Sequence, residues 1–238
     1  MNVKILYPIR INKYLAQKNY STRLGGDELI KKGFVFINGR KAVLGDKVNE
    51  GDKVTVKEKG IKKDYLYYAY NKDVNISTNP DTASKDILQV TRFPVRVFPV
   101  GRLDKDSHGL IVMTNDGRVT DRLLSPLYSH EKEYIVKVEP NFTDKFIELM
   151  SSGVHFDKFV SKKCKIWRKD KSLNTFHIVL TEGKKRQIRR MCEALHHNVL
   201  DLKRIRIMNI ELGNIPLSGF REIKGEELET FLKSLNLA

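Results

Sequence analysis

The amino-acid sequence predicts an α+β protein of two domains, and three observations lead to this prediction. Over residues 1–60, apolar residues first recur at helical spacing and then alternate around a turn signal, which is typical of a small module of helices and a hairpin. A charged stretch over residues 57–64 follows, and its composition suits a linker. Over residues 65–238, strand and helix patterns interleave, which indicates a larger domain with a mixed, mostly antiparallel sheet.

The small module reads as two helices followed by a compact hairpin. We expect a break between the helices at Gly25–Gly26, because glycine is a poor helix former. Asn38–Gly39 is typical of a tight hairpin turn between two apolar runs. The expected elements are helices over residues 11–18 and 27–32, a hairpin over 34–43 and a strand over 53–56.

The larger domain reads as alternating strands separated by amphipathic helices. Period-two alternation predicts the strands, and apolar residues at i, i+3 and i+4 predict the helices. Residues 75–91 are polar and irregular, so we expect a loop there. The expected strands cover residues 65–70, 134–138, 164–167, 176–181 and 200–212, and the expected helices cover 116–124, 143–150, 188–195 and 226–235.

The charge balance points to a polyanionic partner. The chain has 44 Lys and Arg residues against 29 Asp and Glu residues, so its formal net charge is +15. An anionic membrane is the weaker reading, because no apolar run approaches the roughly 20 residues of a spanning helix. Residues 1–10 lack the features of a secretory or transit peptide, and Cys164 and Cys192 form no C-x-x-C pair. We therefore expect reduced cysteines, a cytoplasmic location and a nucleic-acid partner.

One short polar loop between two apolar runs carries the strongest candidate for chemistry. The segment from Val100 to Gly117 reads as strand, tight loop and strand, and the loop presents the carboxylates of Asp104 and Asp106. A loop held between two strands is rigidly supported, as a catalytic side chain requires. The alternative is a loop whose Asp side chains bond their own backbone.

This loop carries a resemblance to a known family. Gly101-Arg102-Leu103-Asp104, with Ser107 and Gly109-Leu110, resembles the G-R-L-D-x-x-S-x-G-L signature of ribosomal-RNA pseudouridine synthases, in the branch that includes RsuA, RluB, RluE and RluF. The resemblance implies the pseudouridine synthase fold, with an active-site cleft across the middle of the sheet. It also implies that Asp104 is the essential carboxylate, with Asp106 as a local rival. No metal or cofactor is implied, because the net reaction is an isomerisation.

Two further motifs match the same family. Gln187-Ile188-Arg189 resembles the motif whose basic residue pairs with the catalytic Asp, and Lys132-Glu133-Tyr134 resembles the motif whose Tyr stacks on the uracil. An alternating strand would also bury Tyr134 merely for packing. The resemblance implies RNA contacts at Arg102 and Arg204. Arg186 and Arg190 fit the description of solvated or phosphate-facing cations, so we add them to the expected RNA contacts.

The small module resembles the alpha-L RNA-binding motif. Its cadence of Ile37-Asn38-Gly39-Arg40-Lys41 followed by two Gly-Asp-x-Val turns carries this resemblance, which suggests RNA contacts at Arg40 and Lys41. One departure is the Ser21–Gly26 segment, which lacks one expected Arg and gains two glycines. The alternative for this module is an ordinary basic surface.

Together these observations predict an enzyme that converts a specific uridine of large-subunit ribosomal RNA to pseudouridine. We expect a cytoplasmic monomer that acts on ribosomal RNA, either free or in assembling particles. Two alternatives stay open from the sequence: the same chemistry on small-subunit ribosomal RNA or transfer RNA, and a non-catalytic ribosome-assembly factor. Intact Asp104, Tyr134 and Arg189 argue against the assembly factor.

Overall fold

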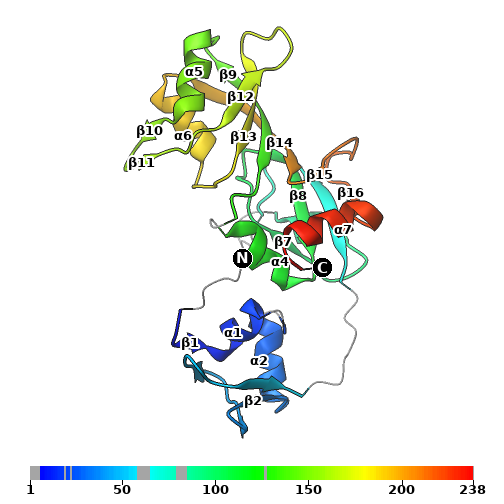
Figure 1. The fold of residues 1–238 in the computed structure, drawn as a ribbon. Coiled ribbons are helices and arrows are strands. Elements are labelled where there is room, and N and C mark those ends of the chain that lie inside the picture. Colours follow the sequence, from blue (N-terminus) through cyan, green and yellow to red (C-terminus); the bar gives the residue numbers. More distant parts are fainter. Residues whose placement is uncertain are drawn as a thin grey trace.

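The computed structural model describes residues 6–18, 20–21, 23–57, 65–78, 85–125 and 128–237. The predicted linker over residues 57–64 therefore lies almost wholly outside the described residues. Figure 1 shows the N-terminal elements as one group and the central sheet with its helices as another. No helix in the described part of the chain combines the length and the apolar character that crossing a membrane requires.

The N-terminal elements form two helices and two small antiparallel sheets. Asn38 and Gly39 both have positive φ values, 50° and 83°, which confirms the predicted turn between two paired strands. The elements are β1 (Ile9–Arg10), α1 (Ile11–Gln17), α2 (Arg23–Lys31), β2 (Val35–Ile37), β3 (Arg40–Lys41), β4 (Lys47–Val48) and β5 (Val54–Val56), with β1 paired to β4 and β2 paired to both β3 and β5. Apolar side chains of these elements make a core of their own.

The expected helix break at Gly25–Gly26 is wrong, because both glycines lie inside α2. A Cβ atom at Gly26 would lie 3.3 Å from Leu15 Cδ1 and 3.5 Å from backbone atoms of Asn12. The absence of a side chain therefore lets α2 pack closely against α1. Contact between the helices outweighs the cost of placing glycine in a helix, which is only about 1 kcal/mol per residue relative to alanine.

A large mixed sheet forms the centre of the second group. Among the described residues, nine strands belong to it, in the order β12-β13-β9-β14-β8-β6-β16, with β15 paired to β14 and β7 paired to β8. Only β14 and β8 are parallel neighbours, so the predicted mixed, mostly antiparallel sheet is confirmed. The strands are β6 (Tyr67–Lys72), β7 (Phe98–Val100), β8 (His108–Thr114), β9 (Lys132–Glu139), β12 (Lys165–Arg168), β13 (Thr175–Leu180), β14 (Asn198–Ile207), β15 (Ile210–Glu211) and β16 (Phe220–Glu222).

Helices cover both faces of this sheet, and each face has its own apolar core. Side chains of α5 (Asp144–Ser152) and α6 (Gln187–Ala194) belong to one core, and those of α4 (Gly117–Leu124) and α7 (Gly225–Ser234) belong to the other. Strand β8 supplies both cores, because Ile111 and Met113 face one side while Leu110 and Val112 face the other. This double burial fixes the strand that follows the polar loop.

Three short features were not predicted from the sequence. The expected loop over residues 75–91 contains α3 (Ile87–Val90), whose N-cap Asp86 forms a capping box with Gln89. Strand β16 pairs with β6 at the edge of the sheet. A hairpin of β10 (His155–Phe156) and β11 (Phe159–Val160) extends beside α6 (Figure 1).

Candidate active site

The loop between β7 and β8 holds Asp104 at a fixed position. A backbone bond from Ser107 N to Asp104 O, 3.0 Å long, closes the turn. Thr78 binds the preceding residue twice, because its Oγ1 donates to Leu103 O at 2.7 Å and accepts from Leu103 N at 3.1 Å. The described part of the chain offers the half-buried Asp104 carboxylate no hydrogen bond or ion pair. The loop is thus held by its backbone while this carboxylate remains available.

The position of Gly109, at the start of β8, requires a glycine. Its φ is +106°, and a Cβ atom there would lie 2.2 Å from Arg204 O on β14. Only glycine combines this backbone conformation with such a close approach. The glycine in the motif is therefore required by the pairing of β8 with β14, which positions the loop.

A cavity of about 840 Å³ brings the three predicted catalytic side chains together. Asp104 from the loop, Tyr134 from β9 and Arg189 from α6 all line it. Several cations share the lining: Arg102, Lys132, Lys162, Lys184, Lys185 and Arg186. The volume lies within the usual range of about 300–1,000 Å³ for small-ligand sites, so a single nucleotide can be accommodated.

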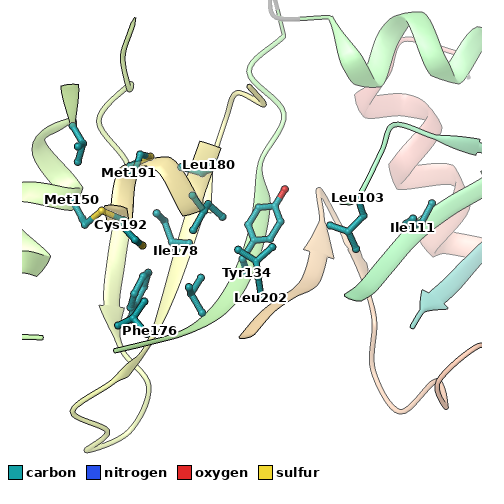
Figure 2. Packing of buried hydrophobic residues seen from close by; sticks show 14 of the residues in the cluster. Leu103, Ile111, Tyr134, Met150, Phe176, Ile178, Leu180, Met191, Cys192 and Leu202 are labelled. Atoms are coloured by element: carbon teal, nitrogen blue, oxygen red, sulfur yellow. The ribbon is translucent and has the colours of Figure 1, made fainter. Parts of the chain in front are cut away.

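The packing expected of Tyr134 is present in the structure. Tyr134 is only 9% exposed and belongs to the same apolar core as Leu180 and Leu202, which Figure 2 labels near it. Its hydroxyl points away from Leu202 in this view, and the residue lines the cavity. Tyr134 is thus a core residue that also lines the cavity, and its contact with a base stays a prediction.

Arg189 pairs with a different residue from the one that the resemblance implies. Its Nε lies 3.3 Å from Asp106 Oδ2, and its Nη2 donates to Asp106 O at 2.8 Å and to Ser107 Oγ at 3.2 Å. Its Nη1 donates to Val199 O at 3.0 Å. The expected pairing with Asp104 is therefore corrected, because these acceptors surround a guanidinium group that is only 14% exposed.

Asp106 is occupied by two arginines. Arg186 Nη2 lies 2.9 Å from Asp106 Oδ2, in addition to the contact from Arg189. Burial acts to raise the pKa of Asp106, but the hydrogen bond from Arg186 and the charges of Arg189 and Arg186 outweigh it and lower this pKa below its ordinary value. Asp106 is thus an ionised partner that orients two cations, which suits a positioning role better than attack on a substrate.

Two of the expected RNA contacts have partners within the protein. Arg204 is only 4% exposed, and its Nε donates to Leu110 O at 2.6 Å while its Nη1 donates to Arg102 O at 3.4 Å. Arg190 forms an ion pair with Asp157 and lies over the ring of Phe156, 4.9 Å from its centroid. The burial of Arg204 corrects the expectation that it binds RNA, whereas Arg190, whose side chain is 27% exposed, stays a predicted RNA contact.

The remaining expected RNA contacts lie on the surface. Arg102 and Arg186 are exposed at the edge of the cavity. Arg40 and Lys41 are exposed on β3, and Arg40 lies 2.9 Å from Asp46. These four residues stay predicted RNA contacts.

Sequence reasoning missed two lysines, of which Lys72 is buried and Lys132 is half-buried. Lys72, at the end of β6, is fully buried and donates to Asp73 O and Ile76 O, both at 2.8 Å. Burial lowers the pKa of Lys72 to about 8, although the charges of Asp73, Asp106 and Asp104 act in the opposite direction. Burial and the charge of Arg204 likewise lower the pKa of Lys132 to about 8. The signal for Lys132 was its position two residues before Tyr134, on the same strand face.

No group of three or more His, Cys, Asp or Glu residues is arranged to hold a metal ion within the part of the chain that the structure describes. The two cysteines are free, and Cys192 is buried in the core.

Comparisons with known proteins point to one family. A family model described as RNA pseudouridylate synthase matches residues 66–194, and a model of the S4 domain matches residues 9–54. The chain is 42% identical over 230 residues to the dual-specificity RNA pseudouridine synthase RluF of Escherichia coli strain K12, which covers 94% of this chain and 79% of that protein. It is 32% identical over 229 residues to the ribosomal large subunit pseudouridine synthase B of Bacillus subtilis strain 168, covering 92% of this chain and 94% of that protein.

A solved structure supports the fold. The crystal structure of a pseudouridylate synthase matches with a TM-score of 0.70 and 23% sequence identity, covering 94% of this chain and 99% of the other. At this level of identity the match shows a shared fold.

Proposed function

The chain belongs to the RNA pseudouridylate synthase family, and we propose that it isomerises a specific uridine of large-subunit ribosomal RNA to pseudouridine. The observation that carries this proposal is the convergence of Asp104, Tyr134 and Arg189 on one cavity. The choice of large-subunit RNA is supported by the similarity to a protein named for that subunit.

The proposed reaction needs no second substrate. The bond between N1 of the uracil and C1′ of the ribose breaks, the base turns, and a bond from C5 to C1′ forms. The proton on C5 leaves and N1 gains a proton, so atoms and electrons balance without an oxidant or reductant. The base must first leave its stack in the RNA to reach a carboxylate inside a cavity.

Each of the three side chains has a distinct proposed role. Asp104 acts on the ribose, either by attack on C1′ or by removal of a sugar proton, and both routes stay open. Tyr134, which lines the cavity, stacks on the uracil and takes the proton from C5 in this proposal. Arg189 holds the loop by its contacts with Asp106 and Ser107, so it serves Asp104 as a positioning residue.

The charge of the protein suits a structured RNA. The exposed cations Arg102, Lys184, Lys185 and Arg186 surround the opening of the cavity, where phosphates flanking the target would lie. Arg40 and Lys41, in the module that matches the S4 domain, would bind a second part of the same RNA. We further propose two domains over residues 1–60 and 65–238, a cytoplasmic location, and action as a monomer on ribosomal RNA, either free or in assembling particles.

The experiment that tests this function is chemical mapping of the product. The protein and an Asp104→Ala variant are incubated with unmodified large-subunit ribosomal RNA, and pseudouridine is mapped by carbodiimide labelling and primer extension. We expect one new stop with the native protein and none with the variant. Glu229→Ala, an exposed change on α7, is the matched control and should keep the stop.

The same assay separates the alternatives. A stop only on small-subunit ribosomal RNA or transfer RNA would keep the chemistry and change the substrate. If the native protein and Asp104→Ala both bind RNA tightly and neither gives a stop on naked RNA or on assembling particles, the enzyme hypothesis is wrong. The protein would then be a ribosome-assembly factor.

A further inference from the structure

The hairpin of β10 and β11 exposes apolar side chains beside the cavity. Phe159 is 44% exposed and Val160 is 66% exposed, although both are large apolar residues. Such exposure in a packed domain commonly marks a contact surface. We therefore ask what this hairpin, which the reaction itself does not use, is built to contact.

The hairpin is firmly anchored. Phe156 pairs in register with Phe159 and is buried, and the centroids of the two rings lie 6.3 Å apart. The ion pair of Asp157 with Arg190 of α6 holds the turn, and Arg190 also lies over the ring of Phe156. Ser161 Oγ accepts from Val154 N at 2.8 Å at the base of the hairpin. Phe159 is thus presented on a fixed support.

Lysine side chains connect this hairpin to the cavity. Lys184 Nζ lies 4.8 Å from the centroid of the Phe159 ring, and Lys184 also lines the cavity. Lys162, one residue beyond the hairpin's base, lines the cavity too, and its backbone N donates to Glu182 Oε1 at 3.0 Å. A strand that delivers a nucleotide to the cavity would therefore pass directly beside Phe159.

The charge around the hairpin suits a polyanion. The exposed lysines of this area are Lys158, Lys162, Lys163, Lys184 and Lys185. Its two acids are engaged within the protein, since Asp157 pairs with Arg190 and Glu182 accepts from Gln187 Nε2 at 2.6 Å. An exposed aromatic ring surrounded by lysines is the arrangement by which proteins hold single-stranded nucleic acid, through base stacking and phosphate contacts.

We propose that the β10–β11 hairpin is a stacking surface for an unpaired base of the substrate RNA, close to the target uridine. The base stacks on Phe159, and Lys184 and Lys162 bind the adjoining phosphates. This inference rests on the proposed function in that RNA is the substrate, and it adds a second point of recognition to the site that holds the uridine.

The test measures binding of the full chain to two probes, a single-stranded oligoadenylate and an RNA duplex of equal length. Phe159→Ala should weaken binding of the single strand by about fivefold or more and leave duplex binding within about twofold. Phe159→Tyr should retain the native affinity, because a Tyr ring also stacks. Trp167→Ala is the matched control, since Trp167 is an aromatic residue of similar exposure, 43%, on β12 of the central sheet, and it should leave both affinities unchanged.

Salt dependence separates stacking from charge. Phe159→Ala should keep the slope of log affinity against log salt for the single strand, whereas Lys184→Ala should reduce it by about 0.7. Equal single-strand affinity of native protein and Phe159→Ala would overturn the proposal, as would an equal loss in Trp167→Ala. Because these readouts do not depend on turnover, a failure to form pseudouridine would refute the proposed function and leave this measurement to decide the hairpin.

Discussion

The two aspartates of the β7–β8 loop should respond very differently to removal of their charge. Asp106 is 46% exposed, and its partner Arg186 is 42% exposed at 2.9 Å. Solvent screening limits such a pair to about 1 kcal/mol, and Arg189 keeps its bonds to Asp106 O, Ser107 Oγ and Val199 O. We therefore expect Asp106→Asn to lower kcat/KM by about fivefold at most.

Asp104→Asn should have a far larger effect. The Asp104 carboxylate is half-buried and lines the cavity. The other carboxylate of the loop, that of Asp106, cannot replace it because it is already bound to two arginines. Loss of a group that acts on the reacting atoms removes a factor of at least about 10³ in rate. The predicted difference between two changes only two residues apart is therefore more than a hundredfold.

The assay is release of tritium from RNA labelled at C5 of uridine, under single-turnover conditions with enzyme in excess. Under these conditions the rate reports the chemical steps, and an RNA-affinity change is recognised by its dependence on enzyme concentration. The melting temperature of each variant is measured alongside, to exclude unfolding. If Asp106→Asn is as inactive as Asp104→Asn, or if Asp104→Asn keeps a tenth of the native rate, the assignment of the two carboxylates is wrong.

Further expectations concern stability and RNA binding. Gly109→Ala puts a Cβ atom 2.2 Å from the backbone of β14 at a φ of +106°, so urea denaturation should show a loss of about 3 kcal/mol or more, whereas Gly183→Ala, which meets open space, should change stability by less than about 0.5 kcal/mol. Burial lowers the pKa of Lys72 from 10.5 to about 8, so the unfolded chain binds more protons between these pH values; Lys72 should therefore raise native stability by up to about 3 kcal/mol from pH 8 to 10.5, and the measured rise should be smaller by this amount in Lys72→Met, where Lys132 still contributes. Joint replacement of Arg40 and Lys41 by Ala should reduce the salt slope of RNA binding by about two with no change in melting temperature, and an unchanged slope would exclude them as phosphate contacts.

The sequence was sufficient to predict most elements and three side chains that line one cavity. Periodicity and turn signals located most of the longer strands and helices, since each of these elements buries one face or both. The motifs then identified Asp104, Tyr134 and Arg189, which are up to 85 positions apart and yet line one cavity. Local patterns predict such elements well because they depend on the burial of neighbouring side chains.

What the sequence could not provide was the choice of partner for each charged group. Two carboxylates two positions apart look equivalent to a distant Arg, and only the approach of α6 to the loop decides that Arg189 meets Asp106. Arg204 lies on an alternating strand and reads as a surface cation. It is buried because β14 runs parallel and close to β8 at that position. The predicted helix break at Gly25–Gly26 was wrong for a similar reason, because the helical state of this segment depends on contact with α1.

These contacts share one consequence, which is that the protein binds the loop on both sides of Asp104 while the Asp104 carboxylate has no partner among the described residues. Arg204 takes Arg102 O, Thr78 takes both backbone groups of Leu103, and Arg189 takes Asp106 O and Ser107 Oγ. Buried side chains that bind backbone carbonyls fix the chain without neutralising the carboxylate that it carries. A loop held in this way needs little reorganisation when the nucleotide arrives, which is the condition under which a single carboxylate is most effective.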